Sequence, residues 1–154
     1  MTTPADRLAA RGLVLPEVTA PLAAYVPALV AGSHVYTSGQ LPMSGGKLLA
    51  TGKVGAEVTP EDAAALAATC ALNAVAAAAS VAGGLEAISR IVKVTGFVAS
   101  APGFTGQPQV INGASELLLD VFGDAGRHAR SAVGVAVLPL DAPVEVELVA
   151  EIAG

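Results

Sequence analysis

Three basic side chains stand close together in the stretch GRHARSAVGV, residues 126–135. Arg127, His128 and Arg130 fall within four positions of a chain that has only eight Lys or Arg and two His. The residues after Arg130 are small and apolar, which places its guanidinium at the mouth of an apolar wall. Such an arginine can bind a carboxylate through two parallel hydrogen bonds, which a lysine cannot do. The alternative is a cation that complements the dipole at a helix end.

Acidic residues alternate in the last extended stretch, residues 143–152. Glu145, Glu147 and Glu151 are predicted to share one face of this strand, because side chains alternate across a sheet. For Glu147 and Glu151 we favour a solvated face. Glu145 and Arg130 each begin a strand, so direct pairing of the two strands as a hairpin would leave them far apart. A shared site therefore requires another strand order or a second chain.

Other patterns of catalytic residues are missing from the sequence. There is no nucleophile elbow, phosphate loop, HExxH motif or Cys/His ligand spacing, so we expect neither a metal site nor a cofactor. The single cysteine, Cys70, is predicted to be a buried inert thiol in a helix. His128 is interpreted as an exposed loop residue whose charging is disfavoured by its neighbouring arginines.

The composition indicates one soluble domain that hides apolar surface against copies of itself. Hydrophobic residues make up 53% of the 154 residues and charged residues 14%, which favours a homo-oligomer. The net charge of −5 and the lack of a basic stripe argue against nucleic acid as a partner. No apolar run reaches the length of a bilayer span, and the first residues do not read as a signal peptide, so we expect a cytoplasmic protein and no membrane partner.

Caps, turns and periodicity predict interleaved strands and helices. Thr59-Pro60 begins one helix and Gly83-Gly84 ends it, and Pro108 begins another. The predicted helices are 5–12, 59–82 and 108–122, and the predicted strands are 25–32, 34–42, 47–54, 88–100, 130–139 and 143–152. Strict alternation in 88–100 would place Val92 and Val94 on one face and Ile91 and Lys93 on the other. This order predicts one mixed sheet whose helices cover a single face, with another subunit covering the opposite face.

Two segments carry a family resemblance: YTSGQLP, residues 36–42, and ARSAVGVAVLPLDAPVEVE, residues 129–147. Together they resemble the Rid family of reactive-intermediate imine deaminases, also called the YjgF family. The spacing agrees as well: Tyr25 lies thirteen residues before Ser38, and Arg130 lies fifteen before Glu145. The resemblance covers about residues 20–152.

This resemblance implies an α+β, chorismate-mutase-like fold with two main helices on one face of a mixed sheet, in a homotrimer with sites between subunits. It implies a single domain, 1–154, in which 1–20 is an N-terminal extension. Arg130 would bind the carboxylate of a 2-imino acid or its enamine tautomer, and Glu145 would position the water that attacks the imine carbon. The remaining substrate-binding residues would be Tyr25, Ser38, Gly39 and Asn112, the last offset by one position from a family asparagine.

The sequence departs from the family pattern near the arginine, which indicates a divergent branch. His128 stands where the family usually has proline, and Ala132 where it commonly has cysteine. The leading hypothesis is a cofactor-free hydrolytic deaminase that yields a 2-keto acid and ammonia. The alternative is a trimer that binds small carboxylates, such as 2-keto acids, without turnover. The endoribonuclease (L-PSP) name carried by some relatives is less favoured, because an acidic chain with two His offers little for RNA cleavage.

Overall fold

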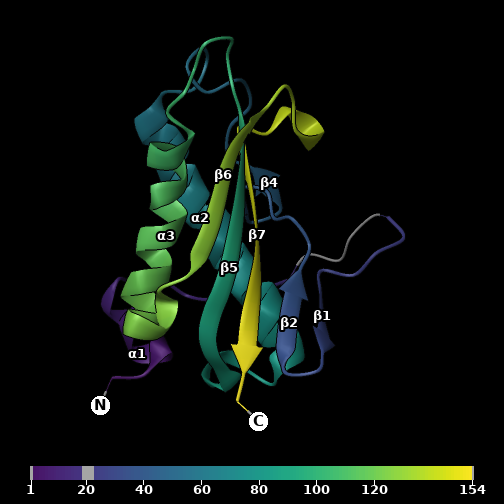
Figure 1. The fold of residues 1–154 in the computed structure, drawn as a ribbon, viewed down its shortest axis with the longest axis vertical. Helices are drawn as coiled ribbons and strands as arrows, with labels where there is room; N and C mark the ends of the chain where they lie inside the picture. Colours follow the sequence, from purple (N-terminus) through teal and green to yellow (C-terminus); the bar gives the residue numbers. More distant parts are fainter. Residues whose placement is uncertain (1, 19–22, 154) are drawn as a thin grey trace.

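A five-stranded mixed sheet forms the centre of the protein in the computed structural model, which describes residues 2–18 and 23–153 (Figure 1). Its strand order is β1-β2-β7-β5-β6. The strands are β1 (Ala28–Ala31), β2 (His34–Thr37), β5 (Ile88–Ala99), β6 (Ala129–Val135) and β7 (Val144–Ile152). Strand β5 runs parallel to β6 and antiparallel to β7, so it separates the two strands that carry Arg130 and Glu145.

The longest helix, α2 (Pro60–Ala82), has both of its predicted ends. The Thr59 hydroxyl accepts a hydrogen bond from the Asp62 amide at 3.1 Å, and Gly83 ends the helix with a φ of 100°. The expectation that no apolar run reaches the length of a bilayer span is wrong for this helix, which is long and apolar enough to cross a membrane. Half of its most apolar window is, however, buried inside the protein. It packs on β7, β1 and β2, as the core helix of a globular domain does.

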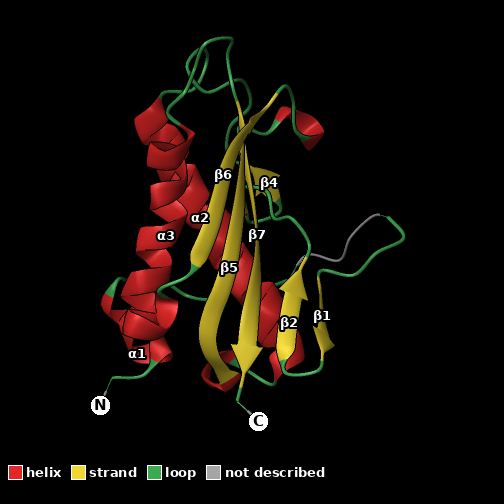
Figure 2. Cartoon of the chain, viewed as in Figure 1, coloured by secondary structure: helices red, strands yellow, loops and turns green. Residues whose placement is uncertain are grey.

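The second long helix, α3 (Gln107–Phe122), packs beside α2 and covers β5 and β6. A short N-terminal helix, α1 (Pro4–Ala10), packs against α3. Both long helices lie on the same side of the sheet, as Figure 2 shows in red and yellow. The α+β fold with helices on one face is therefore confirmed. The last two residues of the expected extension, 19 and 20, lie outside the described residues.

The third predicted strand, 47–54, is wrong in most of its length. Only Lys47–Leu48 (β4) is extended, and it pairs with Met43–Ser44 (β3) in a separate small hairpin. The turn between them is Gly45-Gly46, with φ values of 59° and 77°, as a type I′ turn requires. The chain then turns back at Gly52 and Gly55, and Val54 contributes only isolated bridges to Val58 and Ser100.

Strand β5 does not alternate strictly, so the predicted face of Ile91 is wrong. Register shifts against β7 lie between Ile88 and Arg90 and between Ile91 and Lys93. Each shift acts as a β-bulge, which adds a residue and reverses the faces of the residues after it. Ile91 and Val94 are consequently both fully buried beneath the helices, whereas Lys93 is exposed.

The side of the sheet opposite α2 and α3 is called the open face here. Two of its cross-strand rows are Leu29–Tyr36–Val149, which continues to Lys93, and Glu145–Phe97–Val133. The row between them is the polar Glu147–Thr95–Ser131. Leu29, Tyr36 and Val133 are between 44% and 49% exposed. No second layer in the described residues covers these apolar side chains, as the sequence predicted.

Candidate functional site

Arg130 lies in the edge strand β6, and its side chain is directed to the helix side of the sheet. Nη1 donates to Asn112 Oδ1 at 2.8 Å and to Ser115 Oγ at 3.2 Å, and Nη2 donates to the Pro108 carbonyl at 3.3 Å. All three acceptors belong to α3, and Pro108 is in its first turn. The interpretation of Arg130 as a cation at a helix C-terminus is therefore wrong.

The guanidinium of Arg130 keeps one edge for a ligand. It has five N–H donors. Asn112 and Ser115 take both donors of Nη1, and Pro108 takes one of Nη2. Among the described residues no acceptor reaches Nε–H or the second Nη2–H. Nε and Nη2 share one edge of the guanidinium, and this is an edge that can bind a carboxylate through two parallel hydrogen bonds.

Ser115 was not singled out by the sequence. It lies one helical turn after Asn112, so both side chains project from the same side of α3. The only available signal is the three-residue spacing of these two polar side chains. They lie on a helix whose buried residues include Val110, Ile111, Ala114, Leu117 and Leu118. Which strand the two residues face depends on tertiary packing.

His128 is half-buried and hydrogen-bonded, so its interpretation as an exposed loop residue is wrong. Nδ1 lies 2.6 Å from the Gly126 carbonyl oxygen, and Nε2 lies 2.9 Å from Ser115 Oγ. Because a carbonyl only accepts, Nδ1 carries a proton. In the neutral ring Nε2 then accepts the hydroxyl proton of Ser115.

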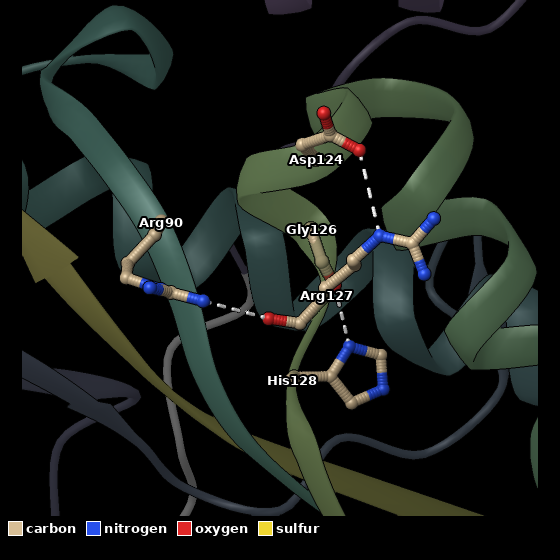
Figure 3. A network of polar contacts seen from close by, with 5 residues as sticks. All are labelled: Arg90, Asp124, Gly126, Arg127 and His128. Carbon is tan, nitrogen blue, oxygen red and sulfur yellow. Dashed lines mark hydrogen bonds and ion pairs between the residues drawn. The ribbon is translucent and has the colours of Figure 1, made fainter.

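The segment before β6 is held from two sides (Figure 3). Arg90 Nη2, from β5, donates to the Arg127 carbonyl at 3.1 Å. The Arg127 guanidinium turns towards Asp124, with Nε 3.4 Å from Oδ1, and away from the His128 ring. Arg127 therefore does not share the hydrogen bonds that fix Arg130.

A cavity of about 260 Å³ opens beside these side chains. Its lining residues are Ser115, Leu119, Arg127, His128 and Arg130. Three of the five are basic and none is acidic, so the cavity suits a small anion. A second cavity, of about 650 Å³, lies between residues 14–18 and the β3–β4 hairpin and contains none of the predicted site residues.

Glu145 lies near the start of β7 on the open face, opposite Phe97 of β5. Partial burial raises the pKa of its carboxyl, and the charge of Glu147 raises that pKa further. The carboxylate packs against the backbone of Gly39, where any side-chain Cβ would collide with Glu145 Oε2. A carboxylate with a raised pKa is a better proton acceptor near neutral pH.

Ser38 and Gly39 lie beside Glu145. Ser38 donates its hydroxyl to the Val26 carbonyl at 2.6 Å, and its amide bonds the Pro27 carbonyl at 2.8 Å. Gln40, two residues after Ser38, pairs with Val146 of β7 through two backbone hydrogen bonds. Tyr25, which precedes Val26, is 55% exposed. The Ser-Gly-Gln segment thus brings the predicted Tyr25 and Ser38 to the same end of the sheet as Glu145.

Arg130 and Glu145 do not meet within one chain. Glu145 pairs with Phe97, and Phe97 pairs with Val133, two strands away and three residues after Arg130. These steps separate the two backbones by about 10 Å across the sheet and about 10 Å along it. An offset of three residues also directs the two side chains to opposite faces. The predicted residues therefore form two groups, Tyr25–Ser38–Gly39–Glu145 and Asn112–Arg130.

Comparison with known proteins gives the family. The family model described as "YjgF/chorismate mutase-like, putative endoribonuclease" matches residues 5–152. Protein TCP17 of Trypanosoma cruzi is 44% identical over 142 residues, which cover 92% of this chain and 89% of that protein. A structure from Agrobacterium tumefaciens, described as of unknown function, is 47% identical with a TM-score of 0.88, covering 96% of this chain and 91% of that one.

Two further structures extend the comparison. One from Shewanella oneidensis, named a putative endoribonuclease, is 40% identical with a TM-score of 0.94 and covers 98% of this chain and all of that one. The structure of TdcF from E. coli, described as having bound serine, is 27% identical with a TM-score of 0.63, covering 89% and 94% of the two chains. The family match spans nearly the whole chain, and the expected resemblance is confirmed: the protein belongs to the YjgF/chorismate mutase-like family.

Proposed function

We propose that the protein is a hydrolytic deaminase of 2-imino acids, which acts at sites shared between the subunits of a cytoplasmic homotrimer. The observation that carries the proposal is the guanidinium of Arg130, held by three oxygens of α3 with its Nε–Nη2 edge free. This edge fits a carboxylate. The serine bound by TdcF is itself a small molecule with a carboxylate.

We propose an oligomer with shared sites because the two halves of the site lie on different faces of one chain and do not meet within it. Arg130 and Asn112 belong to the helix side at the β6 edge, whereas Glu145, Ser38 and Gly39 belong to the open face. If the open face of one subunit covers the β6 edge of its neighbour, the two halves meet. The same contact would bury the exposed Leu29, Tyr36 and Val133.

The proposed reaction needs orientation more than activation. The carbon of a protonated imine is already electrophilic, so a positioned water and a proton acceptor suffice. Glu145 accepts a proton as the water oxygen bonds to the imine carbon, and this proton moves to the nitrogen. The C–N bond then breaks as the new hydroxyl loses its proton to Glu145, and ammonia takes up that proton, so a 2-keto acid and ammonium leave and Glu145 is ionised again.

The test generates the imine with an amino-acid oxidase and measures the added rate of 2-keto acid release. We expect acceleration by the wild type and by Lys47→Ala, a control in the β3–β4 hairpin. Arg130→Lys keeps the charge but loses the two parallel N–H donors of the guanidinium, so its kcat/KM should fall by about tenfold or more. Glu145→Gln should still bind 2-keto acids without accelerating release. No acceleration by the wild type would contradict the proposal.

Two outcomes would assign another function. Arg130-dependent binding of pyruvate without turnover would make the protein a carrier or sensor of small carboxylates. RNA cleavage that persists through purification and disappears in the Arg130→Ala and Glu145→Gln variants would support the endoribonuclease name of the family model.

A further inference from the structure

The orientation of Arg130 depends on a hydroxyl whose own direction is not fixed by α3. Ser115 Oγ has one proton and two lone pairs. It accepts from Arg130 Nη1 at 3.2 Å and lies 2.9 Å from His128 Nε2. If nothing accepted its proton, the hydroxyl would be free to rotate and to turn that proton towards the guanidinium.

His128 is held so that it can accept this proton. The Gly126 carbonyl fixes Nδ1 as the protonated nitrogen at 2.6 Å. Gly126 itself is buried, and a Cβ there would collide with the Leu118 carbonyl of α3, so this anchor is tied to the helix. Arg90 holds the intervening Arg127 carbonyl at 3.1 Å. The backbone thus presents a bare Nε2 to Ser115.

We propose that His128 and Ser115 are positioning residues for Arg130. The order of donation is Arg130 Nη1–H to Ser115 Oγ, Ser115 Oγ–H to His128 Nε2, and His128 Nδ1–H to the Gly126 carbonyl. Because each donor has one acceptor, the guanidinium plane is fixed and with it the direction of the Nε–Nη2 edge, and Arg130, His128 and Ser115 all line the 260 Å³ cavity. The proposal rests on the proposed function in taking that edge as the carboxylate site.

Two substitutions of His128 separate its two hydrogen bonds. His128→Asn can place its amide nitrogen near the position of Nδ1 and keep the bond to Gly126, but it is too short to reach Ser115. His128→Gln can place an acceptor near the position of Nε2 and keep the bond to Ser115, but it loses the donor to Gly126. If His128 served folding alone, His128→Asn would not bind pyruvate more weakly than His128→Gln.

The dissociation constant of pyruvate, measured by calorimetry, is the first readout. Loss of one hydrogen bond that orients a charged group should raise it about fivefold in His128→Asn and in Ser115→Ala. His128→Gln should stay within about twofold of the wild type, and the Ser115→Ala/His128→Asn pair should lose no more than either single variant. During turnover the defect should appear in KM, with kcat nearly unchanged, because carboxylate binding is common to ground and transition states.

A second readout does not need a ligand. Nitrogen NMR of the imidazole should show the tautomer with the proton on Nδ1, and Ser115→Ala should shift the Nε2 resonance. His128→Asn binding pyruvate as the wild type does, or His128→Gln being as weak as His128→Asn, would overturn the proposal. A wild type that binds no 2-keto acid would contradict the proposed function instead, and the Nε2 resonance would then decide on the positioning residues alone.

Discussion

Glu145 shows how a single side chain can be tuned by its place on a strand. Glu147 lies two positions away on the same face, and the apolar ring of Phe97 lies directly opposite on β5. Burial and the like charge of Glu147 both favour the protonated carboxyl, which raises its pKa above the usual value of 4.5. Gly39 permits this placement, because a side chain there would displace the carboxylate.

The raised pKa of Glu145 predicts a dependence of stability on pH. The folded protein binds this proton more tightly than the unfolded chain, so the contribution of Glu145 is most favourable below pH 4.5 and is lost as pH rises through the raised value. Glu145→Gln should therefore increase the free energy of unfolding more at pH 7 than at pH 4. Urea titrations at both pH values measure this.

A variant that removes only one of the two causes of the raised pKa tests the same pH dependence. Glu147→Gln removes the like charge but keeps the burial, so the pKa of Glu145 should fall part of the way towards its usual value. The pH dependence should then be shallower than that of the wild type. An identical pH dependence in wild type and Glu145→Gln would contradict the raised pKa.

At the scale of elements, the close crossing of α2 and α3 explains where Asn112 and Ser115 can stand. Gly113 lies between them, and a Cβ at this position would overlap the Ala64 carbonyl of α2. The absent side chain lets the two helices approach until their backbones touch. This contact sets the rotation of α3 about its axis and so directs the neighbouring side chains towards β6.

Gly113→Ala should therefore destabilise the protein, although glycine to alanine inside a helix ordinarily stabilises by about 0.5–1 kcal/mol. Forcing a methyl group against the α2 backbone should reduce the free energy of unfolding by about 1–3 kcal/mol. Gln109→Ala, on an exposed position of the same helix, should change it by less than about 0.5 kcal/mol. Denaturant unfolding of the two variants makes the comparison, and a stabilised Gly113→Ala would refute the close crossing.

The elements themselves were largely predictable, because local chemistry specifies them. The Thr59 cap, Pro60 and Gly83 defined α2 before any tertiary information, and alternation correctly placed Glu145 and Val144 on opposite faces of β7. The bulges of β5 were not predictable, since no residue pattern marks where an extra residue enters. The hydrogen bonds from Arg130 to Ser115 and between Ser115 and His128 were missed for a related reason: they depend on how α3 and β6 pack against each other.

At the scale of the whole molecule, the two groups of site residues predict complementation between inactive variants. Arg130→Ala retains Glu145, and Glu145→Gln retains Arg130. If each site takes Arg130 from one subunit and Glu145 from another, equal mixing after dissociation and reassociation should restore complete sites in about a quarter of positions. Each variant alone should remain inactive in the 2-keto acid assay.

Light scattering of the unmixed wild type is the matching structural measurement. A trimer is expected, because the open face leaves Leu29, Tyr36 and Val133 exposed in one chain. A stable monomer, or mixed variants that recover no activity, would contradict a site shared between subunits.

The neutral surroundings of Arg130 have one more consequence. Its three partners in the described chain are an amide oxygen, a hydroxyl and a backbone carbonyl, and no carboxylate among those residues forms an ion pair with it. A ligand anion that arrives there is the first counter-ion the guanidinium meets, and it displaces no resident one. Ordinary chloride can therefore compete for the same place, so occupancy by a keto acid should decline as salt is added.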